Sequence, residues 1–178
     1  SAQTGLLYIP QNNLCMDVED LQTNYIAGTP YVGANVHMYP AAGGYGGAFT
    51  AWDPVQGKIV WSIPDQFPVW SGALSTAGGV VFYGTLDGWF RAVDAKNGKE
   101  LWKFKTGSGI VGQPITYRGP DGKQYVAILS GVGGWAGAIV SGGLDPRDRS
   151  AALGFAGAVK ELPKYTTQGG TLYVFSLP

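Results

Sequence analysis

Two tryptophans are the residues best suited to chemistry in this sequence. Trp70 follows Pro68-Val69, and Trp135 directly follows the glycine-rich run Gly131–Gly134. Glycines let a backbone approach a flat ligand closely, and an indole offers a broad stacking face. We therefore predict that both tryptophans line a ligand site. The alternative for each is an aromatic side chain that only packs on the core.

Other reactive side chains lack the partners that catalysis needs. His37 is the single histidine and has no cysteine cluster or second histidine, so a metal or base role is not expected. Ser71 has no partners for a nucleophilic triad, and no Gly-Lys-Ser/Thr phosphate loop is present. Cys15 is the single cysteine, so it is a free thiol or has a partner outside this chain.

Composition favours a β-rich fold and excludes several classes of function. The 178 residues include 29 glycines and 13% aromatic residues, but only 13% charged residues, which suits short, tightly turned strands. The 12 basic and 12 acidic side chains balance, so nucleic acid is not an expected partner. No apolar run approaches the roughly 18 residues of a membrane span. Residues 1–10 lack signal-peptide features, so we expect a mature product or an internal fragment.

A repeat organises the chain. Residues 51–61 and 92–102 share the pattern Ala-x-Asp-x-x-x-Gly-Lys-x-x-Trp at an offset of 92 − 51 = 41 residues, close to the length of a four-stranded propeller blade. Each Asp starts a tight turn, and each Gly supplies a residue with positive φ. Each Trp, at 61 and 102, is predicted to fill the gap between neighbouring blades and to donate its indole N–H to a backbone carbonyl.

The repeat predicts an all-β fold of about three propeller blades, over residues 1–66, 67–110 and 111–178. Insertions interrupt the first and third units, at about 14–46 and 131–170, and the third unit lacks its Trp strand. A propeller closes with about four to eight blades. We therefore expect an incomplete propeller and further blades elsewhere in a longer polypeptide.

The motif resembles the tryptophan-docking motif of the eight-bladed quinoprotein dehydrogenases. Longer strings of residues resemble the methanol dehydrogenase large subunit, namely 13–17, 68–72, 81–88, 101–104 and 131–135. The resemblance is closer to the lanthanide-dependent branch of that family than to the calcium-dependent branch. The resemblance implies a periplasmic enzyme, expected as a homodimer, that oxidises methanol or other primary alcohols. It implies pyrroloquinoline quinone (PQQ) bound with Ca²⁺ or a lanthanide ion, and a c-type cytochrome as electron acceptor.

The resemblance assigns the roles of known family residues to only a few positions of this sequence. Trp70 matches a tryptophan near the quinone, Gly134 and Trp135 match a pair beside the quinone and substrate, and Leu153 matches an apolar residue of the substrate cavity. Cys15 matches a cysteine whose disulfide partner lies upstream. The catalytic Asp and the metal ligands of the family also lie upstream, so the resemblance implies no catalytic or metal-binding residue here and no activity of this chain alone.

Two alternatives remain open from the residues. A non-enzymatic propeller, serving as a scaffold or binding module, would share the Trp repeat without a glycine-lined aromatic pocket. A related quinoprotein for another alcohol or a sugar would share the pocket but take a different substrate.

Overall fold

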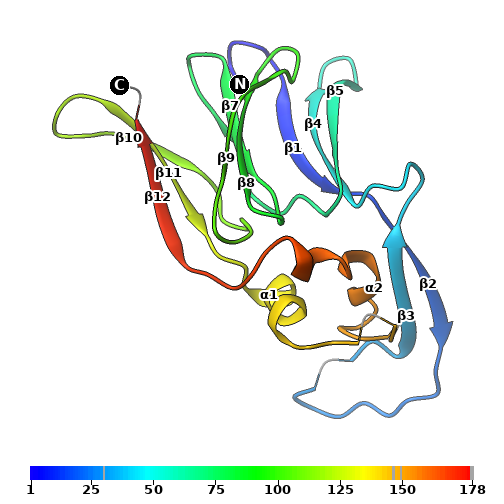
Figure 1. Ribbon diagram of the computed structural model, residues 1–178. Coiled ribbons are helices and arrows are strands. Elements are labelled where there is room, and N and C mark those ends of the chain that lie inside the picture. The colour runs from blue at the N-terminus through cyan, green and yellow to red at the C-terminus, as the bar shows by residue number, and fades with distance from the viewer. Residues whose placement is uncertain (30, 146, 149, 177–178) are drawn as a thin grey trace.

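Three antiparallel sheets stand side by side in the part of the chain that the structure describes (Figure 1). The computed structural model describes residues 1–29, 31–145, 147–148 and 150–176, so the end of the third predicted unit, 177–178, lies outside it. The predicted all-β, partial-propeller fold is confirmed. The positions of the boundaries between units stay predictions.

The three sheets are named blades 1 to 3 in chain order. Blade 1 has the order β1-β4-β5, blade 2 the order β6-β7-β8-β9 and blade 3 the order β10-β11-β12. The strands of blade 1 are β1 (Leu7–Asn12), β4 (Gly47–Asp53) and β5 (Lys58–Asp65). Those of blade 2 are β6 (Leu74–Ser75), β7 (Val80–Gly84), β8 (Trp89–Asp94) and β9 (Glu100–Lys105). Those of blade 3 are β10 (Ile115–Arg118), β11 (Gln124–Ser130) and β12 (Thr171–Ser176).

The two insertions form the layer at one end of the blades. The first contains the hairpin of β2 (Leu14–Asp20) and β3 (Ala34–Pro40). The second contains α1 (Gly134–Ser141), α2 (Ala156–Val159) and the short 3-10 helix η1 (Leu162–Lys164). In Figure 1 the helices lie below the sheets, whereas the N-terminus and the end of β12 lie at the top. The helices are the part of the fold that the repeat did not specify.

The turn chemistry of the repeat is confirmed in both copies. Asp53 accepts the N–H groups of the next turn at 2.9 and 3.0 Å, and Asp94 does the same at 2.8 and 3.2 Å. Gly57 and Gly98 have φ values of +65° and +72°. A short acceptor and a residue free to adopt positive φ therefore close each turn, as the spacing predicts.

Trp61 confirms the predicted docking between blades. It extends from β5 of blade 1, and its indole N–H donates to the carbonyl of Ala95 in blade 2 at 3.2 Å. Trp102, on blade 2, reaches the next blade too, where its ring meets Phe175 of β12 edge to face at 5.1 Å. Both indoles thus join consecutive blades, and an apolar cluster lies at each of these two junctions. In the described part of the chain the predicted bond from the indole N–H to a backbone carbonyl forms for Trp61 but not for Trp102.

Candidate functional site

Trp70 lies on the connection that leads from blade 1 to blade 2, and it is fixed on two sides. Its indole N–H donates to the side-chain oxygen of Asn12 at 3.0 Å. Its ring stacks on Phe155 with centroids 5.1 Å apart and planes 17° apart. The structure therefore places the ring of Trp70 at the base of the helical layer rather than between two blades.

Trp135 lies where β11 runs into α1. The helix begins at Gly134, which has a φ of +55°. Ala136 is fully buried, whereas 51% of the Trp135 side chain is exposed. The indole therefore turns away from the core and leaves a face available, which a purely core-covering aromatic would not do.

The glycines before Trp135 serve two purposes. A Cβ at Gly131 would lie 2.5 Å from the carbonyl oxygen of Gly169, so that glycine allows two protein strands to approach each other. No atom lies within 4 Å of a Cβ built at Gly133 or Gly134. The prediction that glycines leave room beside the indole therefore rests on these last two.

Leu153 lies in a strained loop between the helices. Ala152 and Leu153 have φ values of +52° and +54°, which side chains rarely adopt. The loop is held in place because Gly154 passes against the carbonyl of Val36, where a Cβ would collide. Leu153 is 40% exposed. Strain of this kind persists where the surrounding structure enforces it, and it is common at ligand sites.

One apolar cluster, the helical-end cluster, joins these segments. Trp70, Val132, Ala136 and Ala152 all contribute to it. Its buried members come from the blade connection, blade 2 and the helical layer: Phe67, Leu86, Val132, Ala136, Ile139, Phe155, Ala158, Val159 and Leu162. The structure thus gathers the neighbourhoods of Trp70, Trp135 and Leu153 into one region, with the last two side chains half-exposed on it.

Cys15 and His37 lie on the β2–β3 hairpin, whose Leu14 and Met38 pack on the helical-end cluster. Cys15 is exposed and is a free thiol. His37 Nδ1 lies 3.8 Å from a carboxylate oxygen of Asp17. Within the described ranges, His, Cys, Asp and Glu side chains nowhere gather in a group of three that could hold a metal ion. No helix in the described part of the chain is long and apolar enough to cross a membrane.

Asp65 is a buried acid that the sequence analysis did not single out. It ends β5, it is 8% exposed, and burial, reinforced by the negative charge of Asp87, raises its pKa to about 6. Arg91 opposes this shift from 3.8 Å away. The available signal was a single carboxylate within the segment Ile63 to Trp70, where Gln66 is the only other polar side chain and where a buried charge needs a partner.

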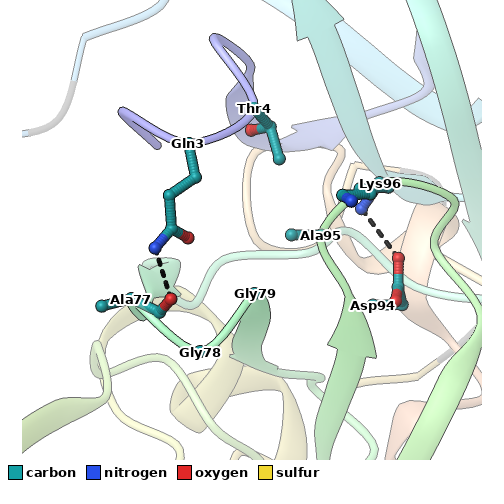
Figure 2. Close-up of a pocket in the computed structure, with 8 residues that line it drawn as sticks. All are labelled: Gln3, Thr4, Ala77, Gly78, Gly79, Asp94, Ala95 and Lys96. Carbon is teal, nitrogen blue, oxygen red and sulfur yellow. Dashed lines mark hydrogen bonds between the residues drawn. The ribbon is translucent and has the colours of Figure 1, made fainter.

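A surface hollow of about 370 Å³ lies at the other end of the blades. Figure 2 shows the Gln3 side chain bonded to the carbonyl of Ala77 and the Lys96 backbone N–H bonded to the Asp94 carboxylate. None of the predicted site residues lines this hollow. Its walls are turn backbone and surface side chains, so its composition carries no reaction chemistry, and the helical end remains the candidate site.

Comparison with known proteins identifies this architecture. Residues 47–126 match the profile of the PQQ family described as glucose/ethanol/alcohol dehydrogenase, beta-propeller domain. The lanthanide-dependent methanol dehydrogenase of Methylacidiphilum fumariolicum is 58% identical over 99% of this chain. The chain carries part of a PQQ beta-propeller domain. The predicted family is therefore confirmed.

Two further relatives of this family bear on the chain. A solved structure of a europium-containing methanol dehydrogenase superposes with a TM-score of 0.94 at 57% identity, over 99% of this chain and 32% of the other. Subunit 1 of the methanol dehydrogenase [cytochrome c] of Paracoccus denitrificans is 46% identical over 93% of this chain and 27% of its own length. The chain spans about 30% of the length of the Methylacidiphilum relative.

Proposed function

We propose that this chain forms one wall of the PQQ site in an enzyme that oxidises methanol or another small primary alcohol. The observation that carries the proposal is the helical-end cluster, which gathers the segments of Trp70, Trp135 and Leu153 in one region. The identity is higher to a lanthanide-dependent methanol dehydrogenase than to the cytochrome c-linked enzyme, at 58% against 46%. A lanthanide ion is therefore the metal we expect, rather than Ca²⁺.

The residues present fit a flat, largely apolar ring system. Trp70 offers an aromatic face that its bond to Asn12 holds in place. Gly134 leaves open space beside the half-exposed indole of Trp135. Leu153 adds an exposed apolar surface for the alkyl part of the substrate. These side chains can orient a ring and exclude water, which are the contributions a protein makes to a cofactor-dependent reaction.

PQQ with its metal ion, when bound, supplies the electron-accepting chemistry of alcohol oxidation. The described residues supply no cluster of metal ligands. We infer that the metal ligands and the carboxylate base come from further blades of the same propeller.

Exposed apolar side chains support the existence of such blades. On blade 1, Leu7 is 52% and Ile59 is 53% exposed, and on blade 3 Leu172 is 59% exposed. Strand residues of this type are normally covered on a packed sheet. The outer faces of blades 1 and 3 are therefore the surfaces on which we expect the remaining blades to pack.

We further propose a periplasmic location, a homodimeric enzyme and a c-type cytochrome as electron acceptor. The cytochrome is supported by the name of the Paracoccus denitrificans relative, a methanol dehydrogenase [cytochrome c]. Cys15, which is exposed and free, is available for a disulfide with a cysteine of the remaining propeller.

The proposal is tested in the intact protein that carries this chain, loaded with PQQ and either a lanthanide or Ca²⁺. We expect quinone absorbance and reduction of an artificial electron acceptor with methanol, and weaker reduction with larger alcohols or sugars. Trp135→Ala should weaken PQQ or substrate binding about tenfold, the equivalent of one lost stacking contact. Trp89→Ala is the control, because Trp89 lies on blade 2 beneath the Lys103 and Lys105 amino groups.

Two outcomes would contradict the proposal. If the intact, metal-loaded protein shows no quinone absorbance, a non-enzymatic propeller becomes the better interpretation. If the protein binds PQQ but Trp135→Ala has the same effect as Trp89→Ala, the assignment of Trp135 to the site is wrong.

A further inference from the structure

A buried polar cluster lies between blades 1 and 2, beside the connection that bears Trp70. Asp65 of blade 1 faces Arg91 of blade 2, with the closest nitrogen and oxygen 3.8 Å apart. Tyr83 lies opposite Arg91 in the β7–β8 register and is 1% exposed. The hydroxyl of Tyr83 and Nε of Arg91 are buried without a hydrogen-bond partner in the described part of the chain. Such a cluster is costly to bury, which calls for an explanation.

Asp65 is coupled directly to the connection between the blades. Its carboxylate accepts the backbone N–H of Phe67 at 3.3 Å. Phe67 is buried in the helical-end cluster, and Trp70 follows three residues later and packs on the same cluster. The bend has little freedom, because a Cβ at Gly47 would lie 2.7 Å from the carbonyl oxygen of Phe67. A shift of the Asp65 carboxylate would therefore move the backbone of the connection and, with it, the position of the Trp70 ring.

Arg91 has a second carboxylate within reach. Its Nη1 lies 4.0 Å from Glu100 on β9, while its Nη2 faces Asp65. Glu100 is more exposed than Asp65 and also pairs with Lys103 at 2.9 Å. When Asp65 is neutral, only Glu100 continues to attract the guanidinium, so Arg91 is drawn away from blade 1.

We propose that Asp65 and Arg91 are a positioning pair, in which the charge on Asp65 decides how the connection bearing Trp70 sits against blade 2. The charged and titratable groups that act on Asp65 are Arg91 from β8, Tyr83 from β7 and Asp87 from the β7–β8 turn. Glu100 from β9 faces Arg91. A buried ion pair of this kind gains little net stability, so a role in fixing one arrangement of the two blades would explain why it is present. The inference rests on the proposed function only for the role of Trp70 as a wall of the quinone site.

The direction of the pH effect follows from burial. Desolvation is the main reason that the pKa of Asp65 is raised to about 6, and Asp87 adds to it. We therefore expect Asp65 to be mostly charged at neutral pH and mostly neutral at pH 5. The environment of Trp70 should change between these two conditions.

The test uses ¹⁹F NMR of the intact protein labelled with 5-fluorotryptophan, in which the Trp70 resonance is assigned by its loss in Trp70→Phe. This readout requires neither bound quinone nor turnover. We expect the Trp70 resonance to shift with pH around a midpoint near 6. In Asp65→Asn the shift should disappear, and the pH dependence of PQQ retention in this range should disappear with it.

Two further variants keep the test decisive if Asp65→Asn does not fold. Arg91→Gln removes the one charge that lowers the pKa of Asp65, so the midpoint should move to higher pH. His37→Gln is the control, because His37 is an ionisable side chain outside the Asp65 cluster, on the hairpin that packs on α2. His37→Gln should leave the midpoint unchanged.

The proposal is overturned if the Trp70 resonance does not titrate, or if its titration survives in Asp65→Asn. It is equally overturned if Arg91→Gln leaves the midpoint in place or if His37→Gln abolishes the transition. A protein that binds no PQQ but shows the expected titration would refute the proposed function while supporting the positioning pair.

Discussion

Replacing Gly98 by alanine tests how the blades dock. Gly98 has a φ of +72°, and a Cβ there would lie 2.8 Å from two ring atoms of Trp61. Alanine at positive φ costs roughly 1–2 kcal/mol, and forcing a methyl group against a packed indole costs roughly 1–3 kcal/mol more. We therefore expect Gly98→Ala to lower the free energy of unfolding by about 2–5 kcal/mol.

Gly57→Ala is the matched control. Gly57 occupies the same place in the other copy of the motif, with a φ of +65°, but no atom lies within 4 Å of its Cβ. It should lose only the roughly 1–2 kcal/mol of backbone strain. The effect of alanine on the unfolded chain is the same at both positions and cancels in the comparison.

The assay is urea unfolding of the intact protein, followed by tryptophan fluorescence. Adding Trp61→Phe removes part of the indole, so the cost of Gly98→Ala should then fall toward that of Gly57→Ala. If the two glycine variants are equally destabilised, or if Trp61→Phe does not change the difference, Trp61 is not what limits space at Gly98.

Two further predictions concern buried polar groups. Ser71→Ala should lower the free energy of unfolding by about 1–3 kcal/mol, because the buried Ser71 hydroxyl accepts the Gly84 N–H at 2.7 Å. The control is Ser75→Ala, at an exposed serine, and equal urea midpoints for the two variants would contradict the prediction. The raised pKa of Asp65, about 6 against an ordinary 3.8, means that the folded state binds this proton more tightly than the unfolded state. The free energy of unfolding should therefore fall by about 2 kcal/mol as the pH rises from about 4 to 6, and Asp65→Asn should remove that slope in urea titrations across this range.

The candidate site was only partly accessible from sequence. The residue types and the resemblance named Trp70, Gly134, Trp135 and Leu153, and the structure brings their segments to one end of the blades. The role of these residues stays a prediction. Neither the stacking of Trp70 on Phe155 nor the positive φ of Leu153 has a signature in local composition, because both result from how two distant segments meet.

Local chemistry determined the repeated blade. Each copy of the motif places three residues within about ten positions of one another: an Asp that accepts turn N–H groups, a Gly with positive φ, and a Trp three residues after the Lys. Because these residues are so close in sequence, their spacing is enough to predict the turn and the strand that follows it. Tertiary structure alone decided which carboxylate is buried, which face of α1 carries Trp135, and that the second insertion forms helices. Burial and electrostatics depend on segments far apart in the chain: Asp65 of blade 1 faces Arg91 of blade 2, and no local pattern specifies that pair.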